Sequence, residues 1–407
     1  MFSAVPVCCK FKSKGGTLRC LHRCRGESMS TNTEILFDHQ SNVAPLGLIA
    51  MNSATELGEK IDSYLVKWAH KGGFATDSFL IESECPRFAS GDGKGIIKST
   101  VRGKDLFIIT DMGNYSVTYD YFGMKNAMSP DDHFQDLKRI IQAASGKAYR
   151  INVIMPILYG GRQHRRSYRE SLDCAVALQE LQAMGVANLI TFDAHDPRVC
   201  NAVPLMGFDN VIPSYQVLKA MYESIEGFHA TKENFMVVSP DEGALGRNML
   251  YASELGVDMG MFYKRRDYSK IVGGRNPIVA HEYLGNDVTG KDVFIADDII
   301  SSGESMLDIA YALKERGANR IFAYATYSIF TNGLEKFDKA YADGFITGVF
   351  GTNLTYRSPE LLQREWFHEV DVTKYVAYFI ASINHDVSIS TVIDPHEKIR
   401  LLLERNK

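Results

Sequence analysis

Short runs of β-branched and apolar residues alternate with longer amphipathic segments along most of the chain. The apolar runs predict strands at 105–110, 151–158, 188–192, 234–238, 259–263, 291–296, 320–324 and 348–351. Segments with apolar residues at helical spacing lie between them, at 129–144, 170–184, 243–255 and 305–316. Strands that alternate with helices in this way predict an α/β fold, in which mainly parallel sheets are flanked by helices.

The same coarse order of strands and helices occurs twice, once before and once after residue 203. We therefore predict a tandem of two related domains, at 29–203 and 204–390, followed by a tail helix at 391–407. The segment 264–284 is basic, contains glycines and shows little periodicity, which predicts a long mobile loop. Loops of this kind often act as lids.

The first 28 residues differ in composition from the rest of the chain. They contain six lysines and arginines and four of the seven cysteines: Cys8, Cys9, Cys20 and Cys24. They lack the paired C-x-x-C spacing of a zinc site and the apolar core of a signal peptide. We interpret them as a disordered or mis-annotated extension with Met29 as the start, the alternatives being a metal-binding knuckle or a targeting arm.

Composition narrows the class of partner. The 407 residues are 45% hydrophobic and 23% charged, as in an ordinary soluble globular protein. A net charge of −4 creates no general basic field, so we expect no nucleic-acid partner. No apolar run approaches the roughly 18 residues of a membrane span. The scattered Cys85, Cys174 and Cys200 favour a reducing cytoplasm.

The segment 293–305 carries the most specific chemistry. An apolar run ends in Asp297 and Asp298, a turn of small residues follows around Gly303, and a helix is predicted from 305. Free backbone N–H groups and the helix dipole would hold a phosphate there, and the carboxylates would accept hydrogen bonds from sugar hydroxyls. We therefore predict a site for a phosphorylated ribose, in preference to a crossover with incidental acids.

Two further polar segments follow predicted strands in the first half. Arg162 and Gln163 belong to a turn, 160–166, whose three arginines suit a polyphosphate, although alone it could equally be a solvated basic turn. His195 lies beside Asp193 and Asp196. It could ligate a divalent ion or its water, or help to place a phosphate, and a purely structural role is equally compatible with its position.

Two more such segments lie in the second half. Asp241 follows Pro240 after a predicted strand, with nearby glycines that permit close backbone approach. The run 264–266, Lys-Arg-Arg, could neutralise charge on transferring phosphates, although charge runs are usually solvated faces. All five segments follow strands, where open α/β sheets build their sites. Their joint occurrence indicates phosphate-transfer chemistry.

The ordered set of motifs resembles that of the ribose-phosphate pyrophosphokinases, also called phosphoribosyl pyrophosphate synthetases, from about residue 88 to 390. The similar motifs are S-T-V-R-G at 99–103, R-Q at 162–163, F-D-A-H at 192–195, S-P-D at 239–241, Y-K-R-R at 263–266, D-D-I-I at 297–300, V-D-V-T at 370–373 and N-H-D-V-S-I-S at 384–390. The resemblance implies two tandem phosphoribosyltransferase-like domains in a cytoplasmic homo-oligomer, a hexamer in the family.

The activity that the resemblance implies is transfer of the β,γ-diphosphate of Mg-ATP to the 1-hydroxyl of ribose 5-phosphate. The products would be 5-phosphoribosyl 1-diphosphate, for nucleotide biosynthesis, and AMP. The implied partners are therefore ATP and ribose 5-phosphate, and the implied cofactor is Mg²⁺.

The resemblance also implies roles for individual residues. ATP binding falls to Arg162, Gln163, Phe88 and Asp92. Catalysis falls to Lys264, Arg266 and His195, and magnesium binding to His195 and Asp241. Ribose 5-phosphate binding falls to Asp297, Asp298, Ser301, Ser302, Gly303, Glu304 and Ser305.

The chain departs from the family pattern in several places. The family's F-x-D-G-E segment is longer here, at 88–95, and lacks the glutamate, and His164 stands where an aspartate is usual. The glycine of the sugar-phosphate loop comes one residue early, as in phosphoribosyltransferases. The segments 111–133 and 391–407 are hard to match. Two alternatives therefore stand beside the synthetase, a phosphoribosyltransferase that consumes the activated sugar and a non-catalytic regulatory homologue.

Overall fold

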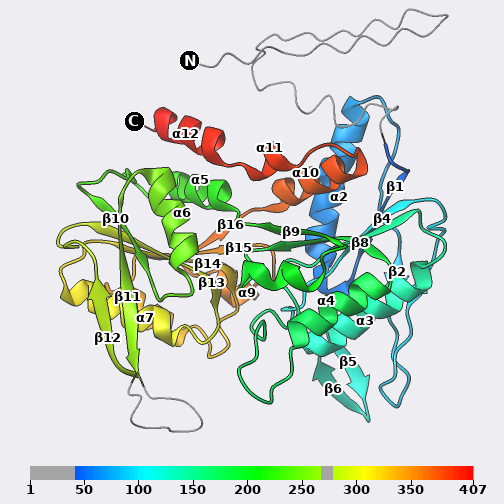
Figure 1. The fold of residues 1–407 in the computed structure, drawn as a ribbon, viewed down its shortest axis with the longest axis horizontal. Coiled ribbons are helices and arrows are strands. Elements are labelled where there is room, and N and C mark those ends of the chain that lie inside the picture. The colour runs from blue at the N-terminus through cyan, green and yellow to red at the C-terminus, as the bar shows by residue number, and fades with distance from the viewer. Residues whose placement is uncertain (1–41, 267–277, 407) are drawn as a thin grey trace, which may run out of the picture.

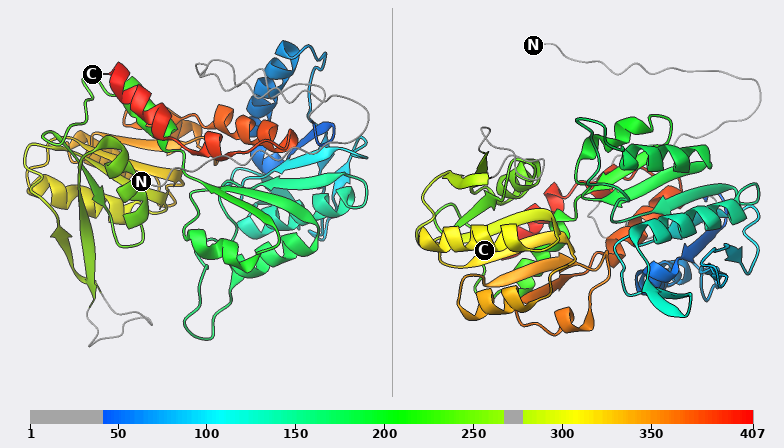
Figure 2. Two further views of the ribbon diagram at one scale, coloured as in Figure 1. Left: turned by 45° about the horizontal axis from the view of Figure 1, so that its top comes forward. Right: turned by 90° about the horizontal axis from the view of Figure 1, so that it is seen from below.

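The computed structural model describes residues 42–266 and 278–406, and the side chains of 264–281 are not described. The N-terminal extension 1–28 therefore lies outside the described residues, as do the side chains of Lys264 and Arg266. The described chain forms two lobes that lie side by side (Figures 1 and 2). Each lobe is built on a mainly parallel sheet with helices on both faces, which confirms the predicted fold class.

The first sheet has the strand order β1-β4-β7-β8-β9, and every neighbouring pair is parallel. These strands are β1 (Leu46–Ala50), β4 (Asp105–Ile109), β7 (Arg150–Ile154), β8 (Val186–Phe192) and β9 (Gly207–Val211). Helices α2 (Thr55–Lys71), α3 (Pro130–Ala144) and α4 (Asp173–Ala183) cover it. In the fully buried β4, Leu106 and Ile108 pack toward α3 and α4, whereas Phe107 and Ile109 pack toward α2. Alternation of this kind is expected of a strand covered on both faces.

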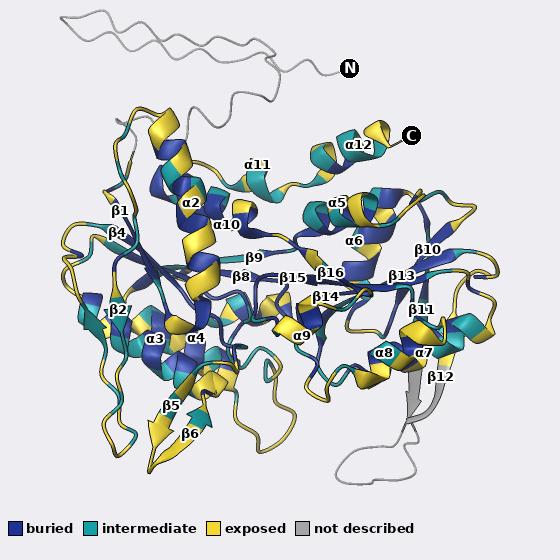
Figure 3. Ribbon diagram, turned by 180° about the vertical axis from the view of Figure 1, so that it is seen from behind, coloured by how far each residue is buried: buried dark blue, intermediate teal, exposed yellow. Residues whose placement is uncertain are grey.

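The second sheet has the order β12-β11-β10-β13-β14-β15-β16 and is parallel except between β11 and β12. Its strands are β10 (Phe235–Ser239), β11 (Asp258–Arg266), β12 (Ile278–Leu284), β13 (Asp292–Ile300), β14 (Ile321–Ser328), β15 (Gly348–Thr352) and β16 (Phe367–Val370). Its helices are α5 (Ser214–Ser224), α6 (Leu245–Leu255), α7 (Glu304–Glu315), α8 (Glu335–Ala342) and α9 (Pro359–Leu362). The central strands of the sheets, such as β4, β10, β14 and β15, are buried (Figure 3).

The chain crosses between the lobes more than once. Strand β9 lies in the first sheet, so that sheet extends to Val211, beyond the boundary expected at 203. Helix α10 (Thr373–Asn384) follows the last strand of the second sheet but packs on α2, where the rings of Trp68 and Tyr378 stack with centroids 4.6 Å apart. Two short helices, α11 (Ser390–Ile393) and α12 (His396–Arg405), complete the tail.

Two sequence-based predictions of local structure were wrong. The segment 264–284 is not one long loop, because β11 and β12 pair as an antiparallel hairpin that leaves only 267–277 outside the described residues. The acidic pair does not follow its strand but lies within it, because β13 stays paired with β14 as far as Ile300. The hard-to-match segment 111–133 contains an exposed hairpin, β5 (Thr118–Tyr121) and β6 (Met124–Ala127) (Figure 3).

The carboxyl-terminal ends of the two sheets face each other. Just after β4, the Asp111 carboxylate accepts hydrogen bonds from Thr355 Oγ1 at 3.0 Å and from the N–H of Tyr356 at 2.8 Å, both just after β15. The Tyr327 hydroxyl on β14 contacts the carbonyl oxygens of Pro156 and Phe192. Polar side chains at these two edges are therefore brought together.

Two further observations on the described residues concern membrane spans and disulfide bonds. None of the described helices is long and apolar enough to cross a membrane. Cys85, Cys174 and Cys200 are free thiols.

The contact of Asp111 across the two lobes predicts a pH-dependent stability. Burial raises the pKa of this carboxyl from 3.8 to about 6, against the hydrogen bonds that it accepts. The folded protein thus holds the proton more tightly than the unfolded chain, so the contribution of Asp111 to stability is largest below about pH 4 and falls as the pH rises to about 6. In Asp111→Asn this titration is absent. The difference in free energy of unfolding, parent minus variant, should therefore fall between about pH 4 and 6.

The measurement is urea unfolding of parent and variant at several pH values. Asp120→Asn, in the exposed strand β5, is the control and should give a difference that does not vary with pH. A flat difference for Asp111→Asn as well would contradict the prediction.

Candidate active site

A polar cavity of about 550 Å³ lies where the two sheets face each other. The first lobe contributes Arg162, Arg165 and His195. The second lobe contributes Asp241, Arg247, Tyr263, Asp297, Asp298, Ser301, Ser302, Gly303 and Ser305, among others. Its volume is in the range of small-molecule sites. The structure thus brings together most of the site residues that the sequence predicts.

A buried ion pair joins the two lobes beneath this cavity. Arg247, on α6, donates from Nε to both oxygens of Asp193 at 2.9 and 2.7 Å, and Thr326 Oγ1 donates to the same carboxylate at 2.6 Å. Arg247 and Asp193 are only 8% and 3% exposed. Burial alone would lower the pKa of Arg247, but Asp193 and the acidic pair raise it, so the guanidinium stays charged.

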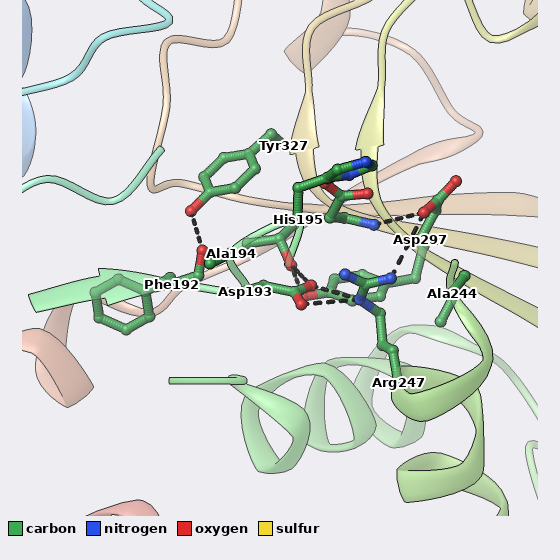
Figure 4. A network of polar contacts seen from close by, with 12 residues as sticks. Phe192, Asp193, Ala194, His195, Ala244, Arg247, Asp297 and Tyr327 are labelled. Atoms are coloured by element: carbon green, nitrogen blue, oxygen red, sulfur yellow. Dashed lines mark hydrogen bonds and ion pairs between the residues drawn. The ribbon is translucent and has the colours of Figure 1, made fainter. Parts of the chain in front are cut away.

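Asp193 also has an unusual backbone. Its φ of 44° lies in the left-handed region, which costs a non-glycine residue on the order of 1 kcal/mol or more. The N–H of Asp193 donates to the carbonyl oxygen of Val211 on β9 at 2.9 Å, and its side chain is held by Arg247 (Figure 4). These bonds stabilise the turn that follows β8 and so place His195, two residues further on.

His195 meets the acidic pair from the opposite lobe. Its Nδ1 lies 2.9 Å from Oδ2 of Asp298, and this hydrogen bond raises the pKa of the histidine. Burial would raise the pKa of Asp298, but His195 and Arg247 outweigh it and bring it to about 2. Burial and the charge of Asp298 raise the pKa of Asp297 to about 8. The two carboxyls are close enough to titrate as a coupled pair, and their pKa values are shifted in opposite directions.

The turn after β13 forms a cradle at the start of α7. Gly303 precedes the helix with φ 79°, and a Cβ on it would lie 2.3 Å from Cε2 of Phe337 on α8, so only glycine fits. The N–H groups in the first turn of any helix have no acceptor within the helix and favour an anion. Ser301, Ser302 and Ser305 line the cavity beside them.

The side chain of Glu304, unlike those of the three serines, does not line the cavity. Its carboxylate forms a 2.5 Å ion pair with Lys336, both side chains are more than half exposed, and Glu304 is absent from the lining of the polar cavity. The two ATP residues expected in the segment 88–95 also lie apart. Phe88 is 56% exposed, and neither Phe88 nor Asp92 lines a cavity of the described residues at this site. The flanking strands, β2 (Ser83–Glu84) and β3 (Ile96–Ile97), lie toward the outer side of the first lobe (Figure 1).

The expected magnesium ligands both line the polar cavity. Asp241 Oδ1 accepts from the N–H groups of Gly243 and Ala244 at 2.9 and 3.1 Å, and His195 faces the cavity from the other lobe. Within the described ranges, no three His, Cys, Asp or Glu side chains form a group that could hold a metal ion. Mg²⁺ is usually bound by one or two carboxylates together with substrate phosphates. The residues present therefore fit a metal that arrives with a polyphosphate.

Arg247 is the site residue that sequence reasoning missed. It lies on the buried face of α6, in line with Ala244, Asn248 and Tyr251. A cation at a buried position of an amphipathic helix needs a buried acid as partner. An arginine on the apolar face of a predicted helix was therefore the feature of the sequence that could have identified Arg247.

Removal of this cation should strongly destabilise the protein. In Arg247→Met, Asp193 keeps its buried charge without its partner, which typically costs about 3–5 kcal/mol of folding free energy. The matched control is Arg198→Met, which breaks an ion pair whose arginine is 77% exposed and should cost far less stability. Urea unfolding measures both. The double variant Asp193→Asn with Arg247→Met should recover part of the loss. Equal losses of stability in Arg247→Met and Arg198→Met would contradict the prediction.

Comparison with known proteins agrees with this architecture. Residues 46–185 match the family model described as the N-terminal domain of ribose phosphate pyrophosphokinase, and residues 214–356 match that of the phosphoribosyl transferase domain. A ribose-phosphate pyrophosphokinase from Pasteurella multocida is 30% identical over 312 residues, which cover 75% of this chain and 89% of the relative. One from Vibrio vulnificus is 28% identical over 85% of this chain and 98% of the relative.

A solved structure shares the whole fold. The phosphoribosylpyrophosphate synthetase from Mycobacterium smegmatis superposes with a TM-score of 0.67 and 20% sequence identity. The superposition covers 84% of this chain and 99% of that chain. The likeness extends over both lobes and the order in which they occur.

Proposed function

Because the chain belongs to the ribose-phosphate pyrophosphokinase family, we propose that it transfers the β,γ-diphosphate of Mg-ATP to the 1-hydroxyl of ribose 5-phosphate, releasing AMP. The observation that supports this most is the polar cavity itself. A sugar-phosphate cradle on one lobe faces arginines and His195 on the other, so acceptor and donor can be held opposite each other. We also propose a homo-oligomer, as the family resemblance implies.

The acceptor occupies the second lobe. The N–H groups at the start of α7, with Ser301, Ser302 and Ser305, bind the 5-phosphate, and the helix dipole favours its negative charge. Asp297 and Asp298 accept hydrogen bonds from the ribose hydroxyls. Because Asp298 is held by His195, the sugar is fixed relative to the opposite lobe.

The donor lies against the first lobe. Arg162 and Gln163 bind ATP, and both line a cavity together with His195. In-line attack on phosphorus depends mainly on positioning and on neutralisation of charge. Lys264 and Arg266, whose side chains lie outside the described residues, would supply that positive charge, as the family resemblance implies. Mg²⁺, when bound by Asp241, His195 and the phosphates, would neutralise further charge on the transferring group.

The test is an assay with Mg-ATP and ribose 5-phosphate that follows AMP and 5-phosphoribosyl 1-diphosphate by anion-exchange chromatography. We expect both products in equal amounts and only when both substrates are present. Consumption of 5-phosphoribosyl 1-diphosphate with a free base would instead support a phosphoribosyltransferase. Binding of ribose 5-phosphate without turnover would support a regulatory homologue.

Replacement of one carboxylate tests the acceptor site. Asp297→Ala removes hydrogen-bond acceptors for the sugar hydroxyls, and a buried polar group left without its partner costs about 1–3 kcal/mol. The KM for ribose 5-phosphate should therefore rise at least about fivefold, with a smaller change in the KM for ATP. Asp308→Ala, an exposed acid on the same helix as the cradle, is the matched control. An unchanged KM for ribose 5-phosphate in Asp297→Ala would place the sugar elsewhere.

A further inference from the structure

Several site residues of the second lobe depend on one helix, α6. Near its start, Arg247 holds Asp193 of the first lobe. The next residue, Asn248, is fully buried. Its Nδ2 donates to the carbonyl oxygen of Ala296 at 2.8 Å, and its Oδ1 accepts from the N–H of Ala296 at 3.1 Å. Because Ala296 directly precedes Asp297 in β13, the position of α6 determines the course of that strand just before the acidic pair.

The turn that leads into α6 belongs to the same unit. Asp241 Oδ1 accepts from the N–H groups of Gly243 and of Ala244, the residue that caps the helix. A shift of α6 would therefore move a proposed magnesium ligand together with Arg247 and the strand that carries the acidic pair. Helix α6 thus places three parts of the site relative to one another.

The C-terminal helix α12 packs on α6 and on its neighbour α5 (Figures 1 and 3). Ile399 of α12 is fully buried and belongs to the same hydrophobic cluster as Tyr251 and Leu255 of α6. Leu402 and Leu403, one turn further on, also pack against that cluster. One face of α12 is therefore apolar and covers α6 and α5.

A polar contact adds to this packing. His396 Nδ1 contacts Oε1 of Glu254, which lies about two turns after Arg247 on α6. The side chain of Glu254 is only 5% exposed, whereas that of His396 is 70% exposed. Because a buried carboxylate needs a hydrogen-bonding or charged partner, this contact favours the docked position of α12.

The other end of the tail is anchored on the first lobe. Asn384, at the end of α10, donates from Nδ2 to the carbonyl oxygen of Ala44 at 2.9 Å and to Asp105 at 3.0 Å. Arg150 Nη2 donates to the carbonyl oxygen of Ile383 at 2.9 Å. The tail from α10 to α12 therefore forms a strap from the first lobe to α6 of the second, and its last part is a segment that is hard to match to the family pattern.

We infer that α12 is a positioning element for the transfer reaction. It lines no part of the polar cavity, and it acts by holding α6, and with it Arg247, Asn248 and the turn at Asp241. This rests on the proposed function and adds to it control of the site by the C-terminal tail. Phosphoryl transfer depends on positioning, so a small displacement of α6 is enough to lower the rate.

Ile399→Glu tests the contact, because it places a charge at a fully buried position of α12. Hydrogen–deuterium exchange of the full chain without ligands should become faster in 396–406, and also in 241–248 and 295–298. Turnover should fall about tenfold or more, since misplacement of a site by a distant change can cost that much. The KM for ribose 5-phosphate should rise several-fold, because Asp297 follows the backbone that Asn248 holds.

Arg400→Glu is the matched control, at the next residue and on the exposed face of the same helix. It should change turnover by less than about twofold, as is usual for surface substitutions. Ile399→Leu keeps the volume and the apolar character of the side chain, so it should retain the exchange rates and the KM of the parent.

A second variant guards against misfolding of the first. His396→Ala removes the contact with Glu254 at an exposed position and so costs little packing. It should cause smaller changes of the same kind in exchange and in the KM for ribose 5-phosphate. Its control is His229→Ala, at an exposed histidine between α5 and β10, which should change neither quantity.

A purely structural role of α12 predicts a different result. Turnover in Ile399→Glu would then fall with the fraction of folded enzyme while the KM for ribose 5-phosphate stayed unchanged, and this would overturn the inference. Unchanged exchange in 241–248 and 295–298 would overturn it as well. The proposed function is read out independently. A parent that transfers no diphosphate would refute the proposed reaction, whereas the exchange measurement needs no substrate and still decides whether α12 holds α6.

Discussion

The buried ion pair between Asp193 and Arg247 is the contact on which the arrangement of the site depends. One partner follows the fourth strand of the first sheet, and the other lies on a helix of the second lobe. A buried charge without its partner costs several kcal/mol, so lobe orientations that separate these two groups are strongly disfavoured. With the pair formed, the carboxyl ends of the two sheets are opposed, and His195 is brought against Asp298. The Asp193–Arg247 ion pair therefore helps to determine how the two sheets meet, and with it the geometry of the cavity.

The same contact explains why two unlike spaces lie side by side. The guanidinium of Arg247 lies near Asp297 as well as Asp193, so charge collects on the side of the second lobe (Figure 4). On the other side of His195, the walls of a second cavity, of about 660 Å³, satisfy their own polar groups and present apolar surface. Positioning of substrates, which supplies much of the catalysis in phosphoryl transfer, is then a property of the joined lobes.

Much of the fold could be predicted from the sequence because local patterns determine it. The strand at 105–110 and the helix at 129–144 match β4 and α3 closely, since periodicity and a serine cap specify them. The hairpin of β11 and β12 and the extension of β13 through Asp297 were missed, because pairing with neighbouring strands stabilises them and their own hydrophobicity does not. In the site, Arg162, His195 and Asp241, which the sequence places after strands, line the polar cavity. Arg247 was not predicted, because its partner Asp193 belongs to a distant segment in the other lobe.

Gly303 bears on whether a bound sugar would accept a diphosphate, as in a synthetase, or would itself be transferred, as in a phosphoribosyltransferase. Its early place in the loop resembles phosphoribosyltransferases, but the structure gives the glycine a local reason: a left-handed φ and close packing against Phe337. The next residue, Glu304, turns outward to Lys336, so the shifted spacing leaves the serines to form the cradle. The position of the glycine therefore reflects how this loop packs on α8 and says little about the reaction. What distinguishes the reactions is the opposite side of the cavity, where the first lobe presents Arg162 and Arg165.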